Sequence, residues 1–280
     1  SSEELIDESL KLQYIEPDLR EGLNERKLAH ENKIPKLIEL TDLKDILHNH
    51  STYSDGVNTL QEMALYCKEL GYEYLGICDH SQSAFYANGL KPNRVLEQHQ
   101  EIEELNKKLF PFKIFKGIES DILNDGSLDY TDEALKSFDF IVASVHSNLK
   151  MDEQKATARL LKAIENPYTT ILGHPTGRLL LSRAGYPINH KKIIDACAAN
   201  HVIIELNAHP YRLDIDWRWI PYCLEKGVKI SINPDAHEKS GYHNMYYGVC
   251  TARKGMLTKE MCFNTFSINE IENYFHQKNK

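Results

Sequence analysis

Two short motifs, far apart in the chain, place histidine and carboxylate side chains at the spacing of metal ligands. His48-Asn-His50 and Asp235-Ala-His237 each leave one residue between two potential ligands. In an extended segment, side chains two residues apart point to the same side, so both members of a pair can reach one ion. The two motifs therefore predict a metal site.

Further imidazole and carboxylate side chains follow soon after other predicted strands. A lone histidine in such a loop is usually no more than a hydrogen-bonded loop residue. The carboxyl ends of parallel strands, however, lie on one face of an α/β fold, so side chains that follow several strands converge there. The candidate metal ligands are His48, His50, Asp55, His80, Glu119, His146, His174, Asp235 and His237.

This set of side chains indicates the chemistry of a metal cluster. A single ion takes about four to six ligands, so we expect two or three divalent cations, with Zn, Mn and Fe(II) all compatible with mixed imidazole and carboxylate ligation. Such a site is locally cationic, although the chain has a formal charge of -8. Adjacent metals activate a water molecule to hydroxide and stabilise phosphoryl oxygens. The expected reaction is phosphoester hydrolysis.

Short apolar runs that alternate with amphipathic, helix-length stretches must position these ligands. Thr59 and Glu62 form a predicted capping box, and Gly71 ends the helix that follows it. Strand and helix alternation predicts a parallel sheet, and periodicity alone leaves open a closed barrel or an open, doubly wound sheet. The expected strands are 44–47, 74–78, 113–118, 138–145, 169–172, 201–206 and 228–232, and the expected helices are 60–70, 93–109, 152–165, 189–200, 216–226 and 267–277.

Composition excludes several other classes of protein. The 280 residues are 41% hydrophobic and 26% charged, and the acidic balance argues against a basic nucleic-acid sleeve or an anionic-membrane binder. Six scattered cysteines predict reduced thiols, and the lack of a leader or of an apolar run of about 20 residues predicts a cytoplasmic protein without a membrane partner.

We expect a polar leading segment, 1–41, and one domain, 42–280. Nucleotide-binding glycine loops and a serine-hydrolase elbow are absent.

The motifs resemble those of the polymerase and histidinol phosphatase (PHP) superfamily of metal-dependent phosphoesterases. The resemblance rests on HNHSTYSDG (48–56), GICDH (76–80), GIE (117–119), SVH (144–146), GHP (173–175) and DAH (235–237). A more specific similarity is to the carboxyl-terminal PHP domain of bacterial family X DNA polymerases. It covers about residues 14–266 and includes EPDLRE (16–21), GYEY (71–74), DIL (121–123), GSLDY (126–130), HPTGR (174–178), Asn207 and RLD (212–214).

The resemblance implies a distorted seven-stranded (β/α)7 barrel with a trinuclear site at the carboxyl ends of its strands. By motif, one ion is held by His48, His50, Glu119 and Asp235. A second, bridged by Glu119, is held by His146 and His174, and a third by Asp55, His80 and His237. We expect the metal-bound hydroxide to be held by Glu119, His146, His174 and Asp235. The candidate substrate-binding residues are Arg178, Arg183, Arg212, Arg253 and His209.

Three functions follow from the resemblance. The first is 3′-5′ exonuclease action on DNA 3′ ends with manganese, in a chain whose segment 1–41 resembles the linker after a polymerase domain. The second is a small-molecule phosphatase of the histidinol-phosphate type, which would require a closed pocket. The third is a structural PHP domain that supports a polymerase domain, for which we would expect lost ligands, whereas all the family positions are filled here.

Overall fold

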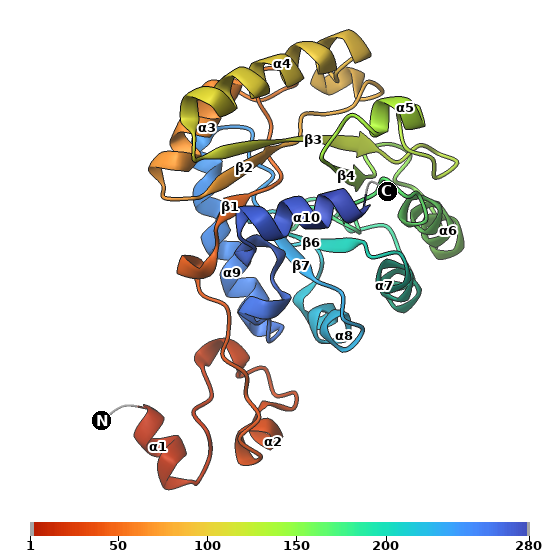
Figure 1. The fold of residues 1–280 in the computed structure, drawn as a ribbon. Coiled ribbons are helices and arrows are strands. Elements are labelled where there is room, and N and C mark those ends of the chain that lie inside the picture. Colours follow the sequence, from red (N-terminus) through yellow and green to blue (C-terminus); the bar gives the residue numbers. More distant parts are fainter. Residues whose placement is uncertain (1–2, 279–280) are drawn as a thin grey trace.

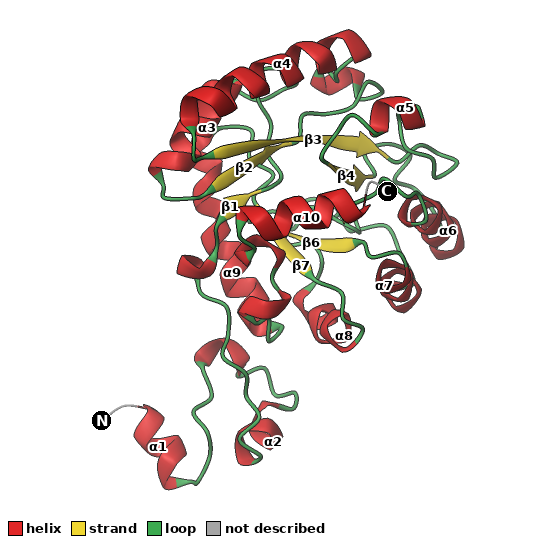
Figure 2. Ribbon diagram, in the orientation of Figure 1, coloured by secondary structure: helices red, strands yellow, loops and turns green. Residues whose placement is uncertain are grey.

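The computed structural model describes residues 3–278 and has a seven-stranded parallel sheet at its centre (Figure 1 and Figure 2). Every neighbouring pair of strands is parallel, and spatial order follows chain order. The strands are β1 (Asp45–Ile46), β2 (Tyr74–Ile77), β3 (Lys113–Asp121), β4 (Phe140–Ser144), β5 (Ile171–Leu172), β6 (Ile203–Asn207) and β7 (Ile230–Asn233).

The first and last strands approach each other, so the sheet forms a nearly closed barrel. Asn49, after β1, forms a parallel bridge with Ala236, after β7, and the His50 N–H donates to the Ala236 carbonyl at 2.8 Å. At the other end, the Asn264 side chain donates to Asp45 Oδ1 at 2.6 Å and to the Ile232 carbonyl at 2.9 Å. The expectation of a seven-stranded (β/α)7 barrel is confirmed, and the open sheet is excluded.

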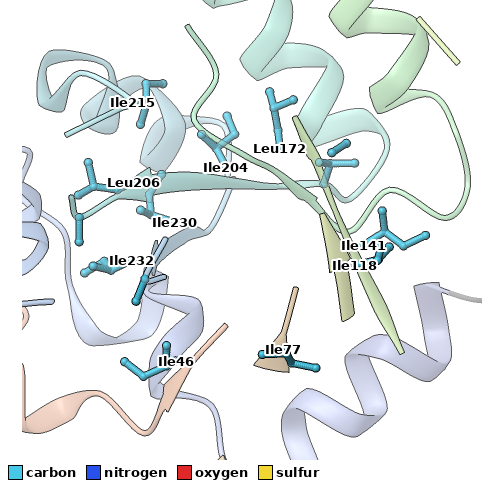
Figure 3. Packing of buried hydrophobic residues seen from close by; sticks show 14 of the residues in the cluster. Ile46, Ile77, Ile118, Ile141, Leu172, Ile204, Leu206, Ile215, Ile230 and Ile232 are labelled. Carbon is cyan, nitrogen blue, oxygen red and sulfur yellow. The ribbon is translucent and has the colours of Figure 1, made fainter. Parts of the chain in front are cut away.

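Helices between the strands cover the outside of the barrel. The predicted capping box is present, since Thr59 accepts from the Glu62 N–H while the Glu62 side chain accepts from the Thr59 N–H. Figure 3 shows Ile118, Ile141 and Ile204 among the buried side chains of the apolar layer beneath these helices. The helices are α3 (Leu60–Glu69), α4 (Pro92–Leu109), α5 (Asp132–Leu135), α6 (Glu153–Ile164), α7 (His190–Ala199), α8 (Ile220–Glu225), α9 (Met245–Lys254) and α10 (Ile268–Lys278).

A second apolar cluster fills the inside of the barrel toward the amino ends of the strands, and α10 covers that end (Figure 1). Phe275 of α10 stacks on Phe140 with ring centroids 5.1 Å apart. The Phe140 ring needs the two glycines beside it, because a Cβ at Gly76 or at Gly117 would lie 2.5 Å from Phe140 Cζ. With its amino end filled by these rings, the barrel offers its carboxyl end to polar side chains.

The leading segment forms a small structure of its own beside the barrel (Figure 1). It contains α1 (Glu3–Ser9), α2 (Glu25–His30) and a separate buried apolar cluster that includes Leu19 and Leu37. Arg253 of α9 holds this segment through ion pairs with Glu16 and Asp18 and a 3.0 Å hydrogen bond to the Ile38 carbonyl. These contacts engage Arg253 with the leading segment, and its predicted contact with substrate stays a prediction.

Across residues 3–278, none of the helices has both the length and the apolar character that crossing a lipid bilayer requires.

Candidate metal centre

Glu119, at the carboxyl end of β3, lies at the centre of the predicted ligands. Its side chain is 1% exposed, and its Oε1 atom lies 3.0 Å from His174 Nε2, 3.1 Å from His146 Nε2 and 3.3 Å from His48 Nε2. Period-two alternation along β3 turns Glu119 and Asp121 to the same side as Phe115, which is the inside of the barrel. One carboxylate therefore contacts imidazoles from three other strand ends.

The second oxygen of the same carboxylate faces the other side of the cluster. Glu119 Oε2 lies 3.0 Å from His80 Nδ1 and 3.6 Å from His50 Nε2, and His50 Nε2 is also 3.0 Å from Asp235 Oδ1. Asp235 adopts a φ of 51°, in the left-handed region that is unfavourable for a residue with a side chain. A residue keeps this conformation only where the surrounding structure holds it.

Asp55 and His237 form the outer side of the cluster. Asp55 Oδ1 lies 3.4 Å from His237 Nε2, 3.6 Å from His80 Nε2 and 4.0 Å from His50 Nδ1. Their side chains are 33% and 39% exposed, whereas those of His48 and His50 are fully buried. A ligand from solvent therefore reaches the cluster on the side of Asp55 and His237.

The predicted ligands form overlapping groups whose ligand atoms lie within 4.8 Å of one another. The group expected for the first ion is present unchanged. The outer group contains the expected Asp55, His80 and His237 and, in addition, His50. The third group contains the expected Glu119 and His146, but it has His80 in place of His174. The groups are His48, His50, Glu119 and Asp235; His50, Asp55, His80 and His237; and His80, Glu119 and His146.

Several buried ligand atoms have no hydrogen bond. They include His48 Nε2, His50 Nδ1, His80 Nδ1 and Glu119 Oε2. Leaving a buried polar atom without a hydrogen bond costs about 1–3 kcal/mol, and folded proteins normally avoid it. Nitrogen and oxygen atoms gathered around one carboxylate are the donor set that divalent transition metals prefer. The residues therefore fit bound divalent metal ions.

The charges in the cluster are strongly coupled. Burial alone would lower the pKa of His146, but the Glu119 and Asp121 carboxylates outweigh it and raise that pKa to about 10. Burial and the neighbouring imidazoles of His80 and His237 lower the pKa of His50 to about 3. The protein alone thus balances its buried carboxylates with protons on some imidazoles, and bound cations would take over that balance and release those protons.

Two acidic residues fix the orientation of ligand imidazoles by contacting the ring nitrogen that faces away from Glu119. Glu205 of β6 is fully buried and accepts from His48 Nδ1 at 2.6 Å and from the His174 N–H at 2.6 Å. Asp121 Oδ1 lies 2.5 Å from His146 Nδ1. A carboxylate on one ring nitrogen holds the other nitrogen in the position and tautomer that a metal requires. Sequence reasoning missed Glu205, although an acidic residue within the apolar run 202–206 is a usable signal.

Asp79 holds the loop that carries Asp55. Its buried carboxylate accepts from Ser51 Oγ at 2.7 Å, from Ser54 Oγ at 2.6 Å and from Gln98 Nε2 at 2.6 Å. Asp79 directly follows the expected strand 74–78, but it is not among the residues predicted for the site. The network shows that it shapes the turn after His50 and so sets the position of Asp55.

The arginines predicted to bind substrate have different surroundings. Arg212 lies at the centre, with its Nε atom 3.4 Å from Asp235 Oδ2. Arg178 is engaged with Asp216 at 2.9 Å and with the Arg212 carbonyl at 2.8 Å, and Arg183 donates to the Gly177 carbonyl at 2.8 Å. Arg212 is thus the one of these three with a direct contact to a predicted ligand.

His209 is half-buried beside the centre in the loop after β6. Its ring accepts from the Tyr211 N–H at 3.2 Å, and its backbone N–H donates to Asn207 Oδ1 at 3.1 Å. Burial lowers the pKa of His209 below its usual value. This histidine is therefore available as a neutral side chain near Asp235.

The sequence pattern of the PHP domain matches residues 47–209, more than half of the chain. The chain belongs to the PHP domain family. A DNA polymerase/3′-5′ exonuclease PolX from Bacillus subtilis is 41% identical over 261 residues, which are 93% of this chain and 45% of that protein. This PHP chain thus spans less than half of the length of that relative.

Other similar proteins are phosphatases by name. A probable phosphatase from Clostridium novyi is 26% identical over 202 residues, 68% of the PHP chain and 78% of that protein. A solved histidinol phosphate phosphatase from Lactococcus lactis, complexed with zinc, L-histidinol and phosphate, superimposes with a TM-score of 0.58 at 17% identity and covers 76% of this chain and 94% of its own. That structure confirms the fold. The PHP chain is a phosphoester hydrolase of this family.

Proposed function

We propose that this chain is a metal-dependent phosphoesterase that removes nucleotides from DNA 3′ ends. The observation that carries the proposal is the cluster of predicted ligands with Glu119 at its centre, in a chain 41% identical to a relative named as a 3′-5′ exonuclease. The whole of that relative is longer than this chain. The proposal therefore concerns the hydrolytic site alone, with 42–280 as its domain and 1–41 as the segment that joins it to a polymerase domain.

Two or three divalent ions, Zn, Mn or Fe(II), would be held by the nine predicted ligands, with Glu119 shared between ions. When bound, they supply activation of a water molecule and stabilisation of charge on phosphoryl oxygens. The residues proposed to surround that water are Glu119, His146, His174 and Asp235.

The chain's own side chains position the ligands and the substrate. Glu205 and Asp121 orient the imidazoles of His48 and His146 through the hydrogen bonds described above. Arg212 lies beside Asp235, where its guanidinium can pair with a phosphate oxygen that approaches the cluster. Arg178 fixes the backbone on which Arg212 sits, because it donates to the Arg212 carbonyl.

Two candidate substrate-binding residues remain. Arg183, which is exposed, and His209, which is half-buried, are proposed to contact the substrate strand outside the cluster. Neither touches a predicted metal ligand through its side chain in the contacts described, so their effect should fall on substrate affinity more than on turnover.

A phosphomonoesterase is a second candidate, favoured by the relatives named as phosphatases. A phosphatase and an exonuclease of this family would use the same ions, so the substrate decides between them. The partly exposed Asp55 and His237 leave the cluster open to solvent, which suits the end of a polymer.

The test compares two substrates on the same metal-loaded protein. Release of 3′ nucleotides from a labelled oligonucleotide is measured beside phosphate release from histidinol phosphate, with Mn2+ or Zn2+ added. We expect nucleotide release to dominate. Asp235→Asn should reduce it by at least about 100-fold, because it removes a charged ligand. Asp195→Asn, an exposed aspartate on α7, is the matched control. A metal-loaded protein that cleaves only histidinol phosphate would contradict the exonuclease proposal.

A further inference from the structure

The loop of residues 81–90, between β2 and α4, exposes two aromatic rings. Phe85 and Tyr86, in a short 3-10 helix, are 85% and 71% exposed. Ala87 and Leu90 of the same loop are buried. The loop thus buries small side chains and presents large ones to solvent. Exposed rings on a fixed loop are typical of a contact surface for a partner or ligand.

Hydrogen bonds hold this loop in place. Ser81 and Leu90 form a bridge that closes its neck, and the Leu90 N–H donates to the His80 carbonyl at 2.8 Å. The Ser83 N–H donates to Asp129 Oδ2 at 2.6 Å. The rings therefore project from a rigid base, and binding a ligand against them requires little ordering of the loop.

The Tyr86 ring lies beside the metal centre. Its centroid is 6.2 Å from that of His80. A group bound at the cluster would therefore have the face or edge of this ring within reach.

A hollow of about 460 Å³ lies beside Tyr86, which lines one side of it. Ser83, Asn124 and Ser147 line it with polar atoms, and Asp121, which also lines it, holds the His146 imidazole. The hollow thus shares a wall with the predicted centre. Its volume lies within the range of small-ligand sites, about 300–1,000 Å³.

The charges of the hollow select the part of a substrate that can occupy it. Asp121 and Asp125 both line it, and Asp125 is paired with Lys162 at 2.8 Å on the exposed side. Carboxylates repel a phosphate, whereas the adjacent cations would attract it. An aromatic wall with hydroxyl and amide groups suits a flat, uncharged ring. A nucleotide matches a hollow for a neutral ring beside a site for phosphate, because its neutral base is attached through the sugar to a charged phosphate.

We infer that Tyr86 is a specificity-determining residue on which the base of the 3′-terminal nucleotide stacks while its phosphodiester lies at the metal centre. This inference rests on the proposed function and adds to it the part of the substrate that the enzyme recognises. Stacking of one base on an aromatic side chain contributes roughly a five- to 150-fold effect on binding.

The first test uses two single-stranded oligonucleotides that differ only at the 3′-terminal residue, which carries thymine in one and no base in the other. The wild-type chain should cleave the base-bearing end with a kcat/KM higher by roughly five- to 150-fold. Tyr86→Ala should abolish that preference, and Tyr86→Phe should keep it because the ring remains. Tyr246→Ala, an exposed tyrosine of α9, is the control for loss of a surface ring and should behave as wild type. A full preference in Tyr86→Ala would overturn the inference.

The second test needs no cleavage. An oligonucleotide with 2-aminopurine at its 3′ terminus is titrated with protein kept in EDTA, and fluorescence quenching reports stacking. Wild type and Tyr86→Phe should quench the base, and Tyr86→Ala should quench it far less. Equal quenching by Tyr86→Ala, or none by wild type, would overturn the inference. Quenching by a wild-type protein that cleaves no DNA when metal is restored would instead contradict the proposed function alone.

Discussion

Glu205 and His48 show how a single buried contact can control the metal centre. The Glu205 carboxylate accepts from His48 Nδ1 at 2.6 Å and from Asn233 Nδ2 at 3.1 Å, and both contacts are buried. An ionised carboxylate makes Nδ1 the protonated nitrogen, which leaves Nε2 to face Glu119 and a metal. The ligand strength of His48 thus depends on a residue that need not touch the ion.

The change Glu205→Gln should weaken metal binding by about 10- to 100-fold, because a neutral amide orients and polarises the imidazole less well. Titration of the metal-depleted protein with Mn2+, followed by calorimetry, measures the affinity. Glu225→Gln, an exposed position on α8, is the matched control and should bind as wild type does. Equal affinity in Glu205→Gln would show that the His48 contact has no role in the centre.

Asp45, at the start of β1, is predicted to make stability depend on pH. Burial raises its pKa from 3.8 to about 7. Between about pH 4 and pH 7 the folded chain therefore keeps a proton that the unfolded chain has lost, so the free energy of unfolding falls as pH rises through this range. Asp45→Asn keeps an acceptor for Asn264 and removes the cost of a buried negative charge at this position.

Urea unfolding should show Asp45→Asn close to wild type at pH 4 and more stable at pH 8, by up to about 4 kcal/mol. Asp195→Asn, at an exposed site, should show no such divergence. A difference between Asp45→Asn and wild type that stays constant across this range would contradict the assignment.

At the scale of elements, two glycines test how the inside of the barrel is filled. The three atoms nearest to a Cβ at Gly76 belong to the side chains of Phe140 and Leu47, whereas a Cβ at Gly117 would also lie 2.5 Å from the Ile77 carbonyl oxygen. Either glycine-to-alanine change should destabilise the chain by about 1–3 kcal/mol through overpacking. Adding Phe140→Leu should recover part of the stability in Gly76→Ala and less in Gly117→Ala. Equal recovery, measured by urea unfolding, would mean that the backbone contact is unimportant.

The alternation of apolar strands and amphipathic helices made the barrel predictable. Elements whose residues are set by contacts with distant parts of the chain were not predicted, or were predicted with other bounds. Helix α9 was not predicted, because Gly248 interrupts its pattern. The structure needs that glycine, since a Cβ there would lie 2.5 Å from Ile232 Cγ2 and 2.6 Å from Ala208 Cβ. Helix α8 begins at Ile220, later than the expected residue 216, because Asp216 instead caps a 3-10 turn.

The predicted ligands lie close together because each is at the carboxyl end of a strand or in the loop after one, and the sequence displays this placement directly. Residues that support them from within strands or from distant loops, such as Glu205 and Asp79, have partners that are far away in sequence. Their role depends on the register of strands and the paths of loops, which no local pattern contains. The ion pairs of Arg253 with the leading segment likewise join residues far apart in the sequence, so no local pattern predicts them.

At the scale of the whole molecule, the metal centre joins strand ends from around the barrel. Ligands come from the loops after β1, β2, β4, β5 and β7 and from β3 itself. Ions that bind only the folded chain stabilise it, by about 2.7 kcal/mol at a free concentration one hundred times the Kd. Metal removal should therefore loosen the barrel as a unit.

Chelation of the metal-loaded chain with EDTA should lower Tm by several degrees in wild type and by much less in Asp235→Asn, which binds metal weakly from the start. Differential scanning calorimetry measures both shifts, with Asp195→Asn as a surface control. A Tm that is indifferent to EDTA in wild-type protein shown to contain metal would mean that the ions lie outside the cluster.

The central claim, that the cluster around Glu119 is the metal centre of a phosphoesterase, is tested most directly by a metal-activation curve. Metal-depleted protein is titrated with Mn2+ while nucleotide release from an oligonucleotide 3′ end is measured. We expect no release without metal, a rise that saturates at two or three ions per chain, and little release at any metal concentration in Asp235→Asn. Release that is independent of metal, or equal in Asp235→Asn and wild type, would contradict it.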